Sequence, residues 1–293
     1  MQFSGAYTAL ITPFRNGEVD RTALGELVER QIEGGIDGLV PCGTTGESAT
    51  MNEAERLDVI RTVVDVANGR VPIIAGTGSN DTIKSTHFTQ RVAEIPGVDA
   101  ALVVVPYYNK PGQRGIIAHF EHVANHGGLP VVMYNVPGRT VVSMTAETIS
   151  TLAAHPNIVA IKEASADMNL DTDMFARAPM GFSMLSGDDF TTFQFVAMGG
   201  HGCISVVSNI APKLVHELVA ATAQANLDTA RRLHTRVHQL ARVLFSDANP
   251  VPTKCAAKLL GWCSDEARLP LYQADGELTA RVETALRQAE LLK

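Results

Sequence analysis

A lysine ends the short apolar stretch Asn157-Ile158-Val159-Ala160-Ile161-Lys162. Its hydrophobic residues are continuous and do not alternate with polar ones. The stretch therefore predicts a strand that is buried on both faces, as in a parallel sheet. The chain contains eight such apolar runs, at residues 6–12, 38–42, 71–76, 100–106, 130–135, 158–162, 182–186 and 202–206.

Amphipathic stretches typical of helices separate most of these runs. They lie at residues 21–33, 52–68, 82–95, 114–126, 145–155, 189–198 and 211–224. Asp20 and Asn52 are the expected N-caps of two of them, and Glu55 stands at the capping-box spacing from Asn52. The alternation of strands and helices over residues 1–225 predicts an α/β fold, a (β/α)₈ TIM barrel that carries the active site.

A doubly wound open sheet is the alternative fold. It would need a glycine-rich loop after the first strand, and Thr12-Pro13-Phe14-Arg15-Asn16-Gly17 does not provide one. The barrel is therefore the preferred prediction. Residues 226–293 predict a C-terminal helical extension on the barrel, with helices at residues 227–246, 250–260 and 277–291.

Composition excludes several classes of function. The net charge is −7 and no basic run is present, which argues against nucleic acid and anionic membranes as partners. No apolar run approaches the roughly 20 residues of a membrane span, and the first residues do not form a secretory signal. The four cysteines form no CxxC pair, so we expect reduced thiols and a cytoplasmic protein.

The histidines do not indicate a metal site. Two groups have helical spacing, and neither has a neighbouring carboxylate in a known ligand pattern. We therefore expect solvated helix faces and no metal at His119, His122, His126, His234 and His238.

Polar residues follow several of the predicted strands, at the end of a barrel where functional groups gather. These segments are Gly43-Thr44-Thr45-Gly46-Glu47-Ser48, Tyr107-Tyr108-Asn109-Lys110-Pro111, Tyr134-Asn135-Val136-Pro137-Gly138-Arg139-Thr140 and Gly187-Asp188-Asp189. Each alone could be a turn or a cap. Their shared location predicts one common site that includes Lys162.

Lys162 has two interpretations. Burial penalises the charged form of a lysine, and a neutral amine attacks carbonyl carbons and forms Schiff bases. The alternative is a structural lysine paired with an acid. Nearby tyrosines can transfer protons, and Arg139 can bind a carboxylate with two hydrogen bonds. The acidic loop after the seventh strand disfavours phosphorylated substrates, so we expect a lysine-dependent aldolase or lyase for small oxo acids.

These motifs together resemble the dihydrodipicolinate synthase family of pyruvate-dependent class I aldolases, whose superfamily also includes N-acetylneuraminate lyase. The resemblance runs essentially from end to end, and Thr44 and Arg139 favour the synthases over the sialic acid lyases. It implies condensation of pyruvate with L-aspartate 4-semialdehyde, in lysine and diaminopimelate biosynthesis. It also implies no cofactor beyond a covalent imine with Lys162, and a homo-oligomer expected to be a dimer of dimers.

The resemblance also assigns roles to residues. It implies that Tyr134 is the general acid/base, linked through Thr44 to Tyr108, which would come from the neighbouring subunit. The expected substrate-binding residues are Thr45, Arg139, Ile204 and Gly187. Other pyruvate aldolases, resembling N-acetylneuraminate lyase or 2-keto-3-deoxy acid aldolase, are the alternative enzymes. A catalytically silent binding protein on the same scaffold is the alternative outside enzymes.

Some family members are inhibited by lysine. The corresponding effector site would include Ser48, Ala49, Asn80, Lys84 and Tyr107. Sensitive enterobacterial-type members have glutamate where this chain has Lys84, and histidines in place of Glu53 and Arg56. Losing the acid at position 84 removes a partner for the effector's ammonium group. We therefore expect a degenerate site with weak or no lysine inhibition.

Overall fold

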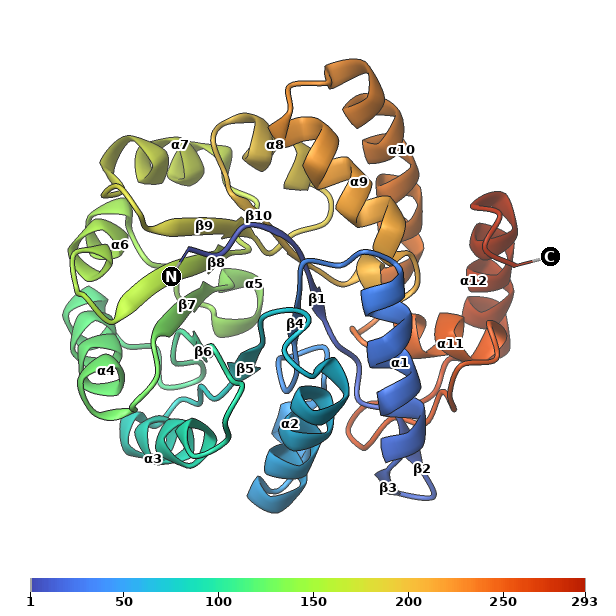
Figure 1. The fold of residues 1–293 in the computed structure, drawn as a ribbon, viewed down its shortest axis with the longest axis horizontal. Helices are drawn as coiled ribbons and strands as arrows, with labels where there is room; N and C mark the ends of the chain where they lie inside the picture. The colour runs from blue at the N-terminus through green and yellow to red at the C-terminus, as the bar shows by residue number, and fades with distance from the viewer. Residues whose placement is uncertain (1, 293) are drawn as a thin grey trace.

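Eight parallel strands form a barrel in the computed structural model, which describes residues 2–292 (Figure 1). They are β1 (Gly5–Ala9), β4 (Gly38–Val40), β5 (Ile74–Gly76), β6 (Ala100–Val104), β7 (Val131–Asn135), β8 (Ile158–Glu163), β9 (Ser183–Ser186) and β10 (Gly202–Ser205). Their order is β4-β1-β10-β9-β8-β7-β6-β5, and a bridge between Leu39 and Ile73 joins the two edge strands. All eight predicted strands and the barrel fold are confirmed.

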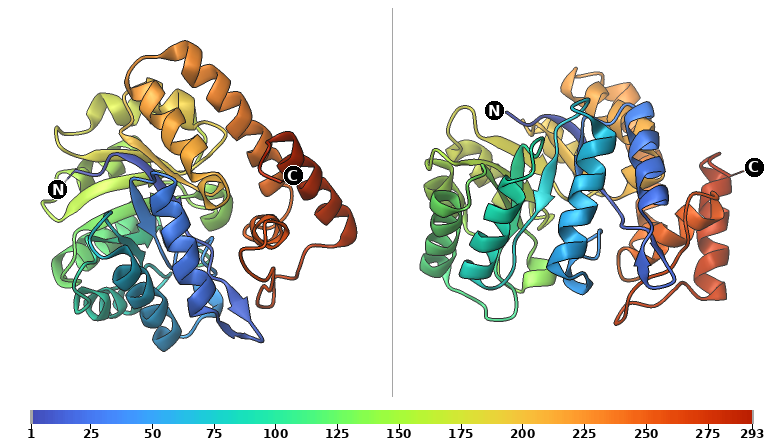
Figure 2. Two further views of the ribbon diagram at one scale, coloured as in Figure 1. Left: turned by 45° about the vertical axis from the view of Figure 1, so that its right-hand side comes forward. Right: turned by 60° about the horizontal axis from the view of Figure 1, so that its bottom comes forward.

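Helices cover the outside of the barrel (Figures 1 and 2). They are α1 (Arg21–Glu33), α2 (Glu53–Ala67), α3 (Thr82–Ala93), α4 (Gln113–His126), α6 (Ala146–Ala153), α7 (Met168–Arg177), α8 (Thr192–Ala197) and α9 (Pro212–Ala223). The Asp20 side chain accepts from the N–H of Ala23, and Asn52 forms a full capping box with Glu55. Both predicted N-caps are therefore confirmed.

Some short elements were not predicted. Helix α7 has only 10 residues, and one of its two buried residues, Asp171, is polar, which makes the helix harder to recognise from apolar residues. The hairpin of β2 (Phe14–Arg15) and β3 (Glu18–Val19), the turn α5 (Pro137–Thr140) and the 3₁₀ turns η1 (Ser48–Thr50) and η2 (Val207–Asn209) are too short for periodicity to indicate.

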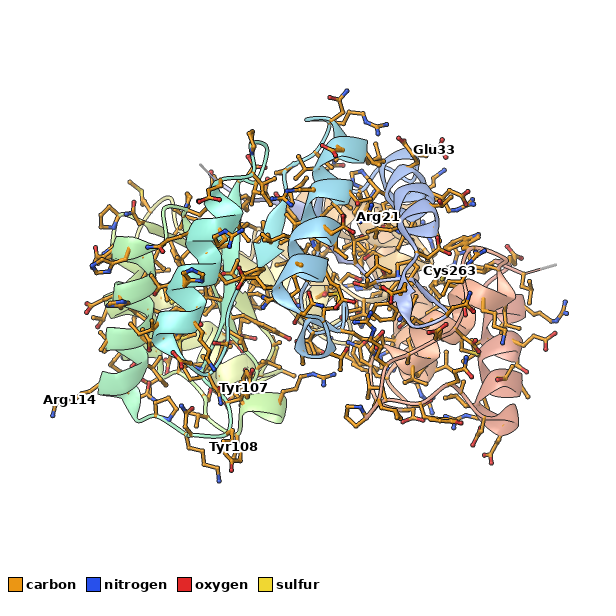
Figure 3. The ribbon with its side chains drawn as sticks, turned by 90° about the horizontal axis from the view of Figure 1, so that it is seen from below. Arg21, Glu33, Tyr107, Tyr108, Arg114 and Cys263 are labelled. Carbon is orange, nitrogen blue, oxygen red and sulfur yellow. The ribbon has the colours of Figure 1, made fainter. Side chains whose placement is uncertain are left out.

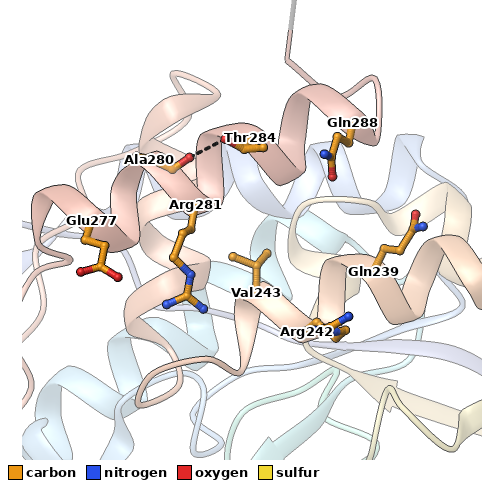
Figure 4. Close-up of a pocket in the computed structure, with 8 residues that line it drawn as sticks. All are labelled: Gln239, Arg242, Val243, Glu277, Ala280, Arg281, Thr284 and Gln288. Carbon is orange, nitrogen blue, oxygen red and sulfur yellow. Dashed lines mark hydrogen bonds between the residues drawn. The ribbon is translucent and has the colours of Figure 1, made fainter.

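The C-terminal extension consists of α10 (Leu227–Leu244), α11 (Val251–Leu259) and α12 (Gly276–Gln288). Side chains of α10 and α11 belong to the same hydrophobic cluster as Leu24 of α1 and Val215 of α9. The extension therefore shares a core with the barrel. A surface hollow lies between α10 and α12 and contains none of the predicted site residues (Figure 4).

A separate apolar cluster fills the barrel. It is built from alternate strand residues, including Val40, Ile74, Val132, Ala160 and Ile204. Because side chains alternate between the two faces of a strand, the residue two positions after Ala160 also points into the barrel. That residue is Lys162, at the carboxyl end of the filled interior.

Candidate active site

Lys162 and Tyr134 lie side by side at the carboxyl ends of β8 and β7. The parallel register pairs their Cα positions directly. Both side chains are buried, and the Lys162 Nζ is 4.4 Å from the centroid of the Tyr134 ring. This arrangement puts an amine next to a phenol, the pair that imine chemistry requires for nucleophilic attack and proton transfer.

Lys162 is not a paired structural lysine. It is 5% exposed, yet it takes part in no ion pair found among residues 2–292. Its neighbour Glu163 points elsewhere, accepting from Asn135 Nδ2 at 2.8 Å and from the Ser165 N–H at 2.6 Å. Burial raises the pKa of this glutamate, and the two hydrogen bonds lower it in part. Glu163 therefore fixes the strand ends and leaves the amine of Lys162 free.

A second buried lysine shows the contrast. Lys254 of α11 is fully buried, and its Nζ forms an ion pair with Glu47 and donates to the Glu266 carbonyl at 2.8 Å. Burial lowers the pKa of Lys254, and Glu47 acts in the opposite direction. Buried charges are normally paired in this way, so Lys254 has a structural explanation and Lys162 does not.

The loop after β4 places two threonines near the site. Thr45 is 3% exposed, and its hydroxyl receives a hydrogen bond from Asn249 Nδ2 at 2.9 Å. Thr44 is half-buried and lines a cavity of about 720 Å³. Glu47 closes the loop with a left-handed backbone, φ 52°, an uncommon conformation for a residue with a side chain. Its buried contact with Lys254 compensates for this strain.

The cavity brings together residues predicted for two different sites. Thr44 and Arg139 line it, as expected for the mouth of the active site. Its wall also contains four of the predicted effector residues, Ser48, Ala49, Lys84 and Tyr107. Asn80 is not part of this lining, and its carbonyl accepts from Asn109 Nδ2 at 2.8 Å. The two predicted sites therefore adjoin each other in one hollow.

Tyr107 and Tyr108 lie at the edge of the molecule, on the loop after β6 (Figure 3). Tyr108 is 87% exposed and has φ 70°. A left-handed tyrosine with so much apolar surface in solvent is uncommon. Within this subunit, the structure does not bring Tyr108 together with Lys162.

Of the remaining predicted binding residues, Gly187 lies beside the lysine. Gly187 follows β9, and its N–H donates to the Glu163 carbonyl at 2.6 Å. A Cβ at Gly187 would be 2.8 Å from Lys162 Cε, so glycine is required for this close approach. Ile204 of β10 is buried in the cluster that fills the barrel.

Two expectations from the sequence were wrong. The helix predicted from residue 189 begins at Thr192, because Asp189 is buried and accepts from the N–H groups of Val206 and Val207. Asp189 therefore braces the end of β10 instead of giving the loop an exposed charge. His119 is not solvated: it contacts Thr82, and burial lowers its pKa to about 4.

Sequence reasoning also missed the residues that the C-terminal extension contributes to the site. These are Asn249, Lys254 and Arg268, whose backbone N–H donates to Glu47 at 3.1 Å. The available signal was Lys254, which lies among apolar and small residues in the first half of α11. In residues 2–292, no cluster of His, Cys, Asp or Glu could hold a metal, and no helix is long and apolar enough to cross a membrane.

A free buried lysine at the carboxyl end of a barrel strand, next to a tyrosine, defines a class: the Schiff-base-forming lyases built on (β/α)₈ barrels. The family comparison is more specific. The chain belongs to the dihydrodipicolinate synthetase family, whose model matches residues 2–289.

Individual relatives are similar to this chain over nearly its whole length. The chain is 48% identical to the 4-hydroxy-tetrahydrodipicolinate synthase of Magnetococcus marinus, over 99% of each chain. A monomeric dihydrodipicolinate synthase variant superposes with a TM-score of 0.97 at 39% identity, covering 99% of this chain and 98% of the other. A chloride-inhibited dihydrodipicolinate synthase from Acinetobacter baumannii, complexed with pyruvate, superposes with a TM-score of 0.96 at 38% identity, covering 99% of each chain.

Proposed function

We propose that this chain condenses pyruvate with L-aspartate 4-semialdehyde to give 4-hydroxy-tetrahydrodipicolinate. One observation carries the proposal: Lys162 is buried, has no counter-ion within residues 2–292, and lies near the carboxyl end of a barrel strand beside Tyr134. The names of the relatives support the choice of substrates, and the pyruvate complex of the Acinetobacter protein supports the first of them.

The chemistry begins at the Lys162 amine. Its Nζ adds to the C2 carbonyl of pyruvate, and loss of water gives an imine. Loss of a methyl proton converts the imine into an enamine, whose carbon attacks the aldehyde carbon of the semialdehyde. The amine of the bound semialdehyde then attacks C2, which releases Lys162 and closes the six-membered ring. The imine is the electron sink, so the cycle needs no further cofactor.

Protons move through the two tyrosines and a threonine in this proposal. Tyr134 is the general acid/base because it lies against Lys162. Thr44 passes protons between Tyr134 and Tyr108 of a neighbouring subunit. The exposure of Tyr108 within its own subunit supports this cross-subunit role, which makes a dimer the catalytic unit. Assembly as a dimer of dimers and a cytoplasmic location remain predictions.

Substrate carboxylates meet different groups. Thr45 holds the carboxylate of pyruvate, next to the imine. Arg139 is exposed at the wall of the cavity, where its guanidinium can hold the carboxylate of the semialdehyde with two hydrogen bonds. In this proposal Gly187, which lies against Lys162, and the Ile204 carbonyl line the pocket that holds the bound intermediates.

Trapping the imine tests the proposal directly. The protein is incubated with pyruvate and borohydride, digested, and the added mass is located by mass spectrometry. We expect the adduct at Lys162 and its loss in Lys162→Ala, whereas Lys213→Ala, an exposed lysine on α9, should be trapped like the wild type. An adduct at Lys254 or Lys110 would contradict the assignment.

Arg139 tests the second substrate. Arg139→Ala should weaken use of the semialdehyde by about 10- to 100-fold, because it removes a charge-assisted hydrogen bond, while imine trapping with pyruvate persists. The same assays with sugar-derived aldehydes separate this function from the other pyruvate aldolases. Preference for such an aldehyde would point to one of those enzymes instead.

A further inference from the structure

The C-terminal extension reaches the pyruvate end of the site through one side chain. Asn249 precedes Pro250, the N-cap of α11, and is 7% exposed. Its Nδ2 donates to Oγ1 of Thr45 at 2.9 Å, a buried hydrogen bond between residues 204 positions apart. Within residues 2–292 the Asn249 Oδ1 has no hydrogen-bond partner. A buried amide whose nitrogen is hydrogen-bonded while its oxygen is not is unusual in a folded protein.

This hydrogen bond sets the direction of the Thr45 hydroxyl. A hydroxyl has one proton to donate and two lone pairs to accept with. Because Asn249 donates to it, one lone pair is occupied and the Thr45 proton must point to a different partner. No protein acceptor for that proton is found among residues 2–292. The hydroxyl is thus oriented as a free donor, which is the polarity a carboxylate requires.

A second contact from the same segment fixes this geometry. Lys254, five residues after Asn249, forms a buried ion pair with Glu47, two residues after Thr45. The backbone N–H of Arg268 also donates to the Glu47 carboxylate, at 3.1 Å. The extension therefore contacts the loop at both Thr45 and Glu47, through three contacts that restrict movement of the amide relative to the hydroxyl.

We propose that Asn249 is a positioning residue for pyruvate, presenting the Thr45 hydroxyl proton to the substrate's carboxylate. The inference rests on the proposed function, in which Thr45 binds that carboxylate. It adds a residue from outside the barrel to substrate recognition, and it explains why the extension has a buried asparagine at this position. The Asn249 amide contacts Thr45 and acts on pyruvate only through it.

The test compares substitutions that differ in hydrogen-bond polarity. Asn249→Asp keeps the shape, but an ionised carboxylate only accepts, so it would draw the Thr45 proton away from pyruvate. Hydrogen bonds to charged groups predict a rise in KM for pyruvate of about 10- to 100-fold in Asn249→Asp. Asn249→Ala, which leaves the hydroxyl free to rotate, should raise it by about 3- to 10-fold. At saturating pyruvate, kcat should change by less than about threefold in both.

Asn226→Asp is the matched control. Asn226 caps α10 in the same extension, its Oδ1 accepts from the Thr229 N–H, and aspartate preserves that cap. The KM for pyruvate should be unchanged in this variant. Thermal unfolding of every variant reports folding separately. A loss of kcat that follows a fall in Tm, with the KM for pyruvate unchanged, would overturn the positioning role.

A double-mutant cycle separates this inference from the function it rests on. Thr45→Val should raise the KM for pyruvate, and Asn249→Ala should then add no further increase, because its effect passes through the missing hydroxyl. If the two effects multiply, Asn249 acts elsewhere and the inference fails while the proposed function stands. If Thr45→Val leaves the KM for pyruvate unchanged, the role of Thr45 itself is wrong.

Discussion

Gly187 lies against the side chain of Lys162. A Cβ at this glycine would be 2.8 Å from Lys162 Cε and 2.9 Å from its Cγ. Real Cβ atoms do not approach other heavy atoms so closely, so either the lysine or the backbone after β9 would have to move. The conformation of the Lys162 side chain therefore depends on the absence of a methyl group at the residue that follows β9.

We expect Gly187→Ala to displace the amine. An error of about 1 Å in the position of a reacting group costs on the order of 10²-fold in rate, so borohydride trapping of pyruvate should slow by about 10- to 100-fold. Gly276→Ala is the control, because a Cβ there meets no atom within 4 Å. Wild-type trapping rates in Gly187→Ala would show that the lysine conformation is not limiting.

Tyr108→Phe should lose about 10²- to 10⁴-fold in activity, because it removes one proton-transfer group. The exposed position of Tyr108 predicts that it acts on a neighbouring subunit. Mixing Tyr108→Phe with Lys162→Ala subunits would then create one intact site in each mixed dimer. About a quarter of the wild-type activity should return after random exchange, measured with coupled assays. If mixed dimers form but activity does not return, Tyr108 does not act in the site of the neighbouring subunit.

Lysine should inhibit weakly, with half-inhibition at concentrations above about 1 mM. Lys84 and Arg56 line the same cavity and would repel the effector's ammonium group. Arg56 is held there, with its guanidinium 3.7 Å from the Phe88 ring centroid. Lys84→Glu should strengthen inhibition, whereas Lys213→Glu, at an exposed position of α9, should not. Strong inhibition of the wild type below millimolar lysine would refute this prediction.

The raised pKa of Asp171 predicts that the stability of the protein depends on pH. Burial, followed by the charges of Glu163, Asp167 and Asp188, raises the pKa of Asp171 from 3.8 to about 7. Between these values the folded chain binds a proton that the unfolded chain has released. The free energy of unfolding should therefore fall as the pH rises from about 4 to about 7.

Asp171→Asn should reduce that pH dependence, since the amide stays neutral throughout. Urea unfolding of both proteins at several pH values measures the difference, and Asp173→Asn on the exposed side of α7 is the control. Parallel curves for Asp171→Asn and the wild type would mean that another group dominates in this range.

Local pattern was sufficient for the barrel. The continuous apolar runs predicted the eight strands because a strand buried on both faces admits few polar residues. That requirement concerns only a few consecutive residues, so it can be recognised in the sequence. The N-caps at Asp20 and Asn52 were predictable for the same reason, since a cap acts within three residues. Helix α7 was not, because it is only 10 residues long and one of its two buried positions is the polar Asp171.

The chain alone predicted that Lys162 lies at a strand end, since that position follows from the apolar run before it, and its role as the nucleophile is a prediction. Only the tertiary structure decided its surroundings. The ring of Tyr134 reaches it from β7 and the backbone of Gly187 from the loop after β9, and Asn249 reaches Thr45 across 204 residues. The sequence contains no local pattern for such contacts, because they depend on how the barrel closes and where α11 packs against it.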